Sequence, residues 1–116
     1  MEIKIIKSKI SFDALKKLAR DGYGDMVKGV ADIKRKVMAL GGELHADAEA
    51  LLINDGSASQ DLWGFNIYPA KIKKERIEFT SLINIKPALG SRSMDVKDQK
   101  IQNQIQSVIS SLIEEK

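Results

Sequence analysis

Cysteine is absent from the 116 residues of this chain. Its absence excludes disulfides, thiol catalysis and zinc sites built from thiolates, and it suits a reducing compartment such as the cytoplasm. No apolar run approaches the roughly 20 residues that a membrane-spanning helix needs, and the first residues show no apolar segment of the signal-peptide kind. We therefore expect a cytoplasmic protein with no membrane partner.

Histidine occurs once, as His45, and the common catalytic motifs are missing. No Gly-x-Ser-x-Gly elbow presents a nucleophilic serine, and a serine hydrolase would have to use His45 as its base. No Gly-x-Gly-x-x-Gly follows a strand, which argues against a dinucleotide-binding fold. The sequence leaves open whether the chain is an enzyme.

The composition is ordinary for a globular chain, with 43% hydrophobic and 30% charged residues. A chain of this length can bury one real core, so we expect a single domain over residues 1–116. The net charge is +3, and two short basic clusters lie at 34–36 and 71–76, where turns are expected. We interpret both as solvated loop charge and expect no nucleic-acid partner.

Periodicity and capping signals predict the elements of the first half. Alternation around Ile3 and Ile5 predicts a short strand, and Ser11 suits the N-cap of a helix over residues 11–21. Residues 26–40 fit either one helical face or two strands. Their β-branched side chains and Gly29 favour two strands with a tight basic turn between them. The second strand is expected to run from residue 37 to 43 or beyond.

The second half is expected to hold a helix, two strands and a last helix. Asp47 is well placed to cap a helix over 48–55. Strands are predicted over 62–68 and 77–85, with Phe65 opposite Phe79 if the two form a hairpin. An apolar repeat after Asp98 predicts the C-terminal helix.

The predicted order is therefore β-α-β-β-α-β-β-α. It indicates an α+β fold in two layers, with the helices on one face of a mostly antiparallel sheet. The first six elements have the order of a ferredoxin-like split β-α-β, so the chain is compatible with a ferredoxin-like core. An unprotected edge of this sheet would allow a homodimer.

A divalent-metal site is the sharpest chemical hypothesis. Glu43, His45 and Asp47 alternate along the expected strand, so their side chains would share one face with Cα atoms roughly 6.5–7 Å apart. Carboxylate and imidazole ligands suit zinc, manganese or iron, and Asp32 on the neighbouring strand is a candidate fourth ligand. Such a metal would activate water for a hydrolase. Two alternatives stay open: His45 acts as acid or base beside Glu43 without a metal, or these are ordinary polar residues.

A second hypothesis is an anion site at Ser91, Arg92 and Ser93, which precede the last helix. Hydroxyls, a guanidinium and free backbone N–H groups can hold a phosphate or a carboxylate. The segment lacks the pattern of a phosphate-binding loop, and an ordinary connecting loop is the alternative.

A third hypothesis concerns Asn66 and Asn84, because asparagine is disfavoured in strands. Both are expected to point away from the apolar face, where they would line a polar pocket together with Asp32. A solvated sheet face is the alternative.

Three segments together carry a resemblance to a known family. They are Gly41-Gly42-Glu43-Leu44-His45-Ala46-Asp47 with Ala50-Leu51-Leu52, Leu62-Trp63-Gly64 with Asn66-Ile67-Tyr68-Pro69, and Ile83-Asn84-Ile85-Lys86-Pro87 with Ser91-Arg92-Ser93. The chain resembles a family of small prokaryotic proteins known only as a domain of unknown function. The resemblance spans nearly the whole chain and implies a bacterial or archaeal cytoplasmic protein. It supplies no activity.

Two function classes follow from these patterns. We favour a small binding or interaction module, whose protein or small-molecule partner lies on an exposed sheet face or at the loop of residues 90–93. The alternative is a small metal-assisted hydrolase that uses Glu43, His45 and Asp32. The two are separated by whether Asp32, Glu43, His45 and Arg92 converge in one cleft.

Overall fold

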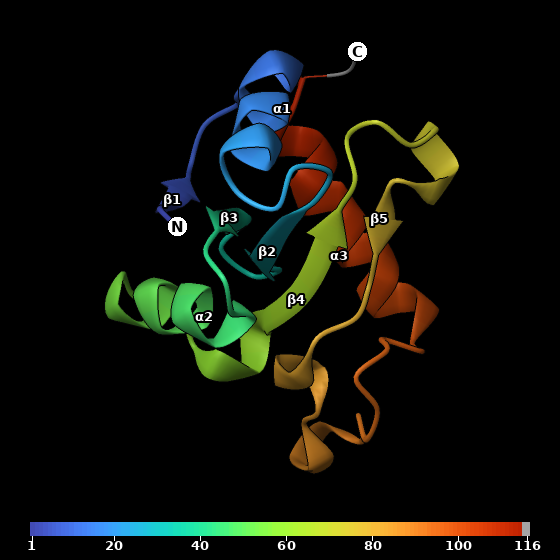
Figure 1. The fold of residues 1–116 in the computed structure, drawn as a ribbon. Coiled ribbons are helices and arrows are strands. Elements are labelled where there is room, and N and C mark those ends of the chain that lie inside the picture. Colours follow the sequence, from blue (N-terminus) through green and yellow to red (C-terminus); the bar gives the residue numbers. More distant parts are fainter. Residues whose placement is uncertain (115–116) are drawn as a thin grey trace.

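A computed structural model describes residues 1–114. Its α-helices are α1 (Phe12–Asp21), α2 (His45–Asn54) and α3 (Gln99–Leu112), and its strands are β1 (Ile3–Ile6), β2 (Val27–Asp32), β3 (Val37–Gly41), β4 (Leu62–Ile67) and β5 (Ile77–Glu78) (Figure 1). Short 3-10 helices occupy Ser59–Asp61, Lys73–Glu75, Leu82–Asn84 and Pro87–Leu89. The α+β class and the predicted order of helices and strands are confirmed. None of the helices within this range is long and apolar enough to cross a membrane.

The five strands form one antiparallel sheet in the order β1-β3-β2-β4-β5. The ambiguous residues 26–40 are the β2–β3 hairpin, as the strand interpretation predicted. Its turn is fixed by Asp32, whose Oδ1 accepts hydrogen bonds from the backbone N–H groups of Lys34 and Arg35.

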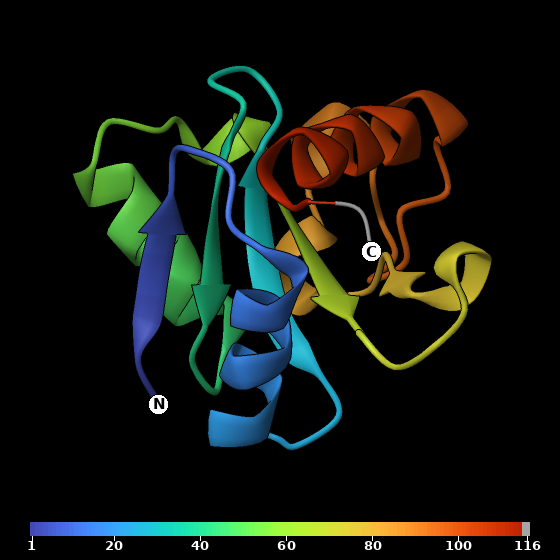
Figure 2. The same ribbon diagram turned by 90° about the horizontal axis from the view of Figure 1, so that it is seen from above.

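Helices cover both faces of the sheet, so the expectation of two layers with all helices on one face is wrong. The larger core lies between the sheet and α1 and α3, and includes Phe65 and Leu15. The smaller core lies on the opposite face, where Leu52 of α2 packs near Val30 and Leu62. Figure 2 shows α2 on one side of the strands and α1 and α3 on the other.

The handedness of the crossovers explains this arrangement. The connections β1-α1-β2 and β3-α2-β4 each skip one strand and move the same way across the sheet, although β1 and β3 point in opposite directions. Two crossovers of the same hand must then pass over opposite faces. The β1-β3-β2 half matches a ferredoxin-like core, but β4 lies beside β2 instead of beside β1, so the second half does not.

The β3–α2 connection is shorter than expected. Gly41 and Gly42 have φ values of +111° and +85°, which end the extended strand because L-residues avoid this region. Leu44 is the N-cap of α2, and the helix begins at His45. The predicted strand through residue 43 and the capping role of Asp47 are therefore wrong, and Asp47 lies within the first turn of the helix.

The strand predicted over 77–85 ends at Glu78, because the side chain of Asn84 takes the place of a strand beside β4. Its Oδ1 accepts from the Gly64 N–H at 2.8 Å, and its Nδ2 donates to the Gly64 carbonyl at 3.0 Å. The observed register would next set Phe79 opposite Phe65, but the chain leaves β4 before that pair forms. Residues 79–96, called here the 79–96 lobe, then fold back through bridges between Thr80 and Asp95 and between Lys86 and Ser91.

Candidate functional site

The proposed metal ligands do not share one face. His45 is buried at the start of α2, whereas Glu43 and Asp47 are exposed. Their alternation required an extended strand through residue 47, and that strand ends at Gly41. Within residues 1–114, no group of three or more His, Asp and Glu side chains is arranged to hold a metal ion.

His45 instead joins α2 to β4. Its Nε2 lies 2.8 Å from the backbone carbonyl of Phe65, and a carbonyl only accepts, so the neutral ring carries its proton on Nε2. Burial lowers the pKa of His45 and outweighs the opposing effect of that carbonyl. A neutral imidazole that donates to the backbone has a structural role at this position.

Asn66 lies beside this contact on the α2 face of the sheet. Its Nδ2 donates to Glu78 Oε1 at 2.7 Å, and the Tyr68 hydroxyl approaches the same oxygen at 3.4 Å. Asn66 also raises the pKa of His45 slightly, although its Oδ1 makes no hydrogen bond of good geometry within the described range. His45, Asn66 and Glu78 thus form one polar cluster.

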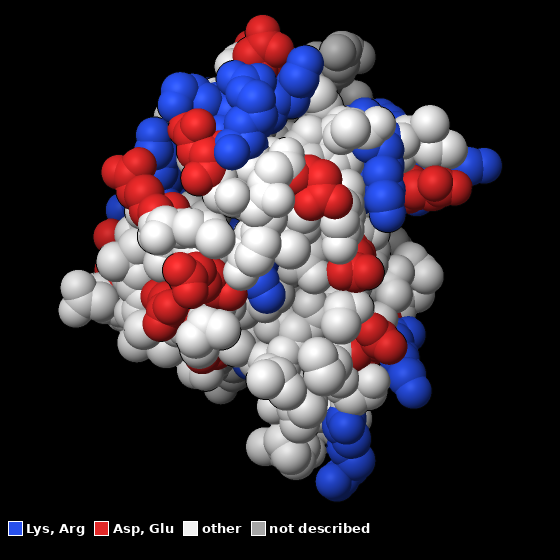
Figure 3. Space-filling model, in the orientation of Figure 1, with Lys and Arg blue, Asp and Glu red and all other residues white. Residues whose placement is uncertain are grey.

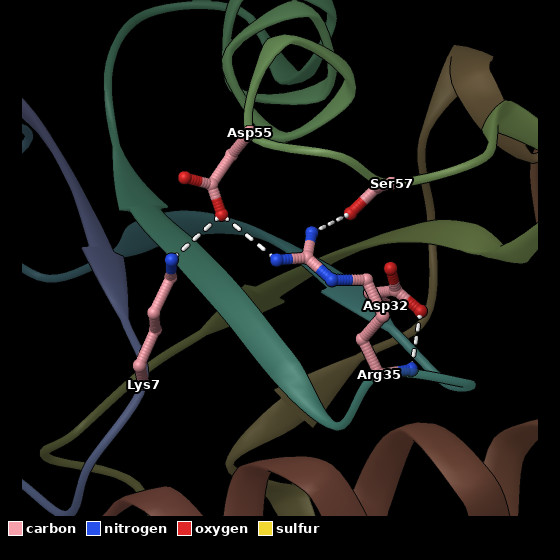
Figure 4. A network of polar contacts seen from close by, with 5 residues as sticks. All are labelled: Lys7, Asp32, Arg35, Asp55 and Ser57. Carbon is pink, nitrogen blue, oxygen red and sulfur yellow. Dashed lines mark hydrogen bonds and ion pairs between the residues drawn. The ribbon is translucent and has the colours of Figure 1, made fainter.

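Asp32 lies at the other end of β2, in a separate network. It is fully buried, and the turn that it fixes carries Arg35. The Arg35 guanidinium donates to Ser57 Oγ at 2.6 Å and to Asp55 at 2.9 Å, and Asp55 also pairs with Lys7 at 2.9 Å (Figure 4). Arg35 first and Lys7 second lower the pKa of Asp55. These contacts tie the end of β1, the β2–β3 turn and the end of α2 together.

The Asn84 side chain likewise bonds to backbone groups, and no hydrogen bond within residues 1–114 joins it to Asp32. Besides its two bonds to Gly64, it donates from Nδ2 to the carbonyl of Met94 at 3.1 Å. The Ser91 hydroxyl donates to the Asn84 carbonyl at 2.6 Å. The 79–96 lobe is therefore built around this buried side chain.

The predicted anion-site residues meet in one hollow of about 370 Å³, between the 79–96 lobe and the start of α3. We call it the α3 hollow. Ser91, Arg92 and Ser93 line it together with Lys97 and the side chain of Trp63. Trp63 is 4% exposed, and its buried Nε1 has no hydrogen-bond acceptor among residues 1–114. Such an orphaned donor is uncommon in folded proteins.

Two carboxylates also line the α3 hollow, and both already have internal donors. Asp95 Oδ1 accepts from the Thr80 hydroxyl at 2.6 Å, and Asp98 Oδ1 accepts from the Lys100 N–H at 2.9 Å as the N-cap of α3. Arg92 is exposed and makes no such contact with the described residues. In the α3 hollow the cationic groups are therefore available to a ligand, whereas each carboxylate already accepts a hydrogen bond from the protein.

Comparison with protein-family models identifies the family. The model described as "Protein of unknown function (DUF5674)" matches residues 4–112. The chain belongs to the DUF5674 family. The match confirms the resemblance carried by the three sequence segments and extends over nearly all of the chain. No curated protein and no solved structure matches it.

In this DUF5674 chain, the candidate residues lie in different parts of the molecule. Ser91, Arg92 and Ser93 come together, and His45 lies beside Asn66. Asp32, Glu43, His45 and Arg92 do not share a cleft, which was the arrangement that the hydrolase hypothesis needed.

Sequence reasoning missed two residues of the α3 hollow. Trp63 alternates with Phe65 and Ile67, so its strand pattern indicated only a core position. Lys97 precedes the cap of α3 and carries no motif. Lys97 is close to Arg92 in the sequence, whereas Trp63 meets the lobe through tertiary contacts that leave no local signal.

Proposed function

We propose that this DUF5674 protein is a small binding module that takes an anionic ligand in the α3 hollow. The presence of Arg92, Lys97, Ser91 and Ser93 together with Trp63 around one hollow carries the proposal. Guanidinium and ammonium groups bind carboxylate or phosphate oxygens through charge-assisted hydrogen bonds. The cysteine-free composition supports a cytoplasmic setting, and the resemblance noted in the sequence supports a prokaryotic one.

The donors in the α3 hollow have complementary roles. Ser93 Oγ accepts from the Asp95 N–H, so its own hydroxyl proton is available to a ligand. The Ser91 hydroxyl is held by the Asn84 carbonyl and fixes the loop that carries Arg92. A compact oxyanion, such as a carboxylate or phosphate group, fits these donors best.

Trp63 is the only tryptophan, so its fluorescence reports on the hollow directly. We would titrate the protein with sodium phosphate and with sodium citrate at constant ionic strength. A saturable fluorescence change is expected in the wild type and at least tenfold weaker binding in Arg92→Gln. Lys34→Gln, an exposed cation in the β2–β3 turn, is the matched control and should behave as the wild type. An equal response from wild type and Arg92→Gln would refute the proposal.

A further inference from the structure

A separate concentration of positive charge lies in a hollow of about 420 Å³ between α1 and residues 69–76. We call it the basic cleft. Four cationic side chains line it, Lys16 and Arg20 from α1 and Lys71 and Arg76 from the loop, against one carboxylate, Asp25. Figure 3 shows Lys and Arg gathered over α1 and again over the 69–76 segment. In the sequence the α1 cations and the loop cations lie far apart, and only the cations of residues 71–76 were interpreted as solvated loop charge.

The loop cations are held in place by aromatic rings. The Arg76 guanidinium lies 4.8 Å from the centroid of the Phe12 ring, and its Nε donates to the Lys71 carbonyl at 3.2 Å. Lys71 Nζ lies 4.3 Å from the centroid of the Tyr68 ring. A cation–π contact of this kind positions the charged group over the ring, while the N–H donors that point away from the ring stay available to a ligand. The Arg76 guanidinium makes no further hydrogen bond within residues 1–114.

The α1 cations are also little neutralised. Among residues 1–114, Lys16 pairs with one carboxylate, that of exposed Asp13 at 3.9 Å, and an exposed ion pair of this kind contributes little free energy. Arg20 is exposed and has no ion pair with the described residues. The net charge of the whole chain is only +3. The four cations and one carboxylate of the basic cleft therefore make it a local region of positive potential. Such a concave positive surface attracts polyanions strongly.

We infer that the basic cleft binds the phosphodiester backbone of a nucleic-acid strand. The rings of Phe12 and Tyr68 lie against the cations, and Phe12 is buried, so they offer no platform for stacking bases. Binding should then be to phosphates, and independent of sequence. A strand can enter a concave cleft, whereas a flat bilayer cannot, which favours nucleic acid over an anionic membrane. This inference is independent of the anion site in the α3 hollow.

The test is fluorescence polarisation with a labelled single-stranded DNA of 12 nucleotides, measured over a series of KCl concentrations. Contacts to three or four phosphates predict that log K falls with log[KCl] with a slope of about −2 to −3. Arg20→Gln/Lys71→Gln should bind roughly tenfold or more weakly, and the slope should be about 1–2 shallower. Lys34→Gln/Lys36→Gln removes the same charge from the other basic cluster and should stay within about twofold of the wild type.

Other results would overturn the inference or assign the basic cleft to a different ligand. Equal weakening of both double variants, or binding that does not depend on salt, would overturn the inference. Displacement of the DNA by a mononucleotide at the same phosphate concentration would assign the cleft to a free phosphorylated ligand instead. Binding to phosphatidylserine vesicles with the same residue dependence, and none to DNA, would assign it to a membrane. Arg92→Gln should leave DNA binding unchanged, so failure here and failure at the α3 hollow are distinguishable.

Discussion

Three buried polar side chains, His45, Asp32 and Asn84, hold parts of this fold in place. Each bonds to backbone groups, and two of them reach across the fold. The partner of His45 is Phe65, 20 residues further along the chain, and that of Asn84 is Gly64, 20 residues earlier. Removal of one of these side chains would leave its buried backbone partner without a hydrogen bond, which costs about 1–3 kcal/mol. We therefore expect these residues to contribute to stability even where they take no part in chemistry.

His45 gives the stability of the protein a specific pH dependence. Its pKa is lowered in the folded state, so the unfolded chain takes up a proton more readily below about pH 6.5. The stabilisation is complete above that pH and is lost as the pH falls through the folded pKa. We expect the wild type to gain stability from pH 5 to pH 7 in urea unfolding, and His45→Gln to gain less. Parallel curves for the two proteins would contradict this assignment.

Asn84 should tolerate no substitution. Asn84→Ala removes both bonds to Gly64 and the bond to Met94, and we expect a loss of about 2–3 kcal/mol in the free energy of unfolding. Asn84→Asp keeps the shape but loses both donors and buries a carboxylate, so it should be destabilising at pH 7 and partly recover in acid. Asn54→Ala, at an exposed position, is the control for urea melts and should stay near the wild type.

At the scale of elements, the sequence predicted the type of each helix or strand better than the residue at which it ends. Alternation and caps located α1, the β2–β3 hairpin, β4 and α3. The expected strand over 77–85 looked regular in its apolar residues, but Ser81 and Asn84 redirect the chain across Gly64. A Cβ at residue 64 would come within 2.5 Å of the Ser81 Cβ. That fit depends on three distant residues together, so no local pattern could reveal it.

The start of α2 did carry a local signal. Gly41 and Gly42 are adjacent, and both take positive φ, so the pair itself marks the end of β3. The metal hypothesis depended on the alternation of Glu43, His45 and Asp47, which places them on one face only if the chain stays extended beyond the two glycines. Ser91, Arg92 and Ser93 line one hollow because they are adjacent in the sequence and need no distant element to bring them together, and anion binding there stays a prediction.

The cap of α3 offers a test at this scale. Asp98 Oδ1 accepts from the Lys100 N–H at 2.9 Å, and loss of such a cap costs about 1 kcal/mol. We expect Asp98→Ala to lower the unfolding free energy by about that amount and Asp98→Ser to retain most of it. Circular dichroism during urea unfolding measures both. Equal stability of the two variants would show that the cap contributes little.

At the scale of the whole molecule, the sequence could not place the helices. The periodicity of α1 and α3 indicates an apolar stripe but not which face of the sheet it meets. α2 is less informative still, since Leu51 and Ile53 are exposed while Leu52 is buried. The basic cleft was hidden for the same reason, because only the folded chain brings Arg20 to Arg76.

Both cores share the same central strands, which predicts cooperative unfolding. Val30 and Ala31 are neighbours in β2, yet they belong to opposite cores, so neither core can survive the loss of that strand. We expect residues 1–116 to unfold in a single two-state transition. Trp63 fluorescence and far-ultraviolet circular dichroism should give coincident urea curves. Separate midpoints would indicate two units instead of one domain.

The carboxamide of Asn84 also limits how copies of this protein can assemble. A growing fibre of sheets needs a free strand edge on both sides of every molecule. On one side of this sheet, Asn84 occupies the outer backbone groups of Gly64, and β5 offers only two residues. On the other side lies β1, with four residues at the sheet edge. If copies of the protein paired through β1, each would offer only the two residues of β5 as a further strand edge, so we expect such pairing to stop at a closed pair.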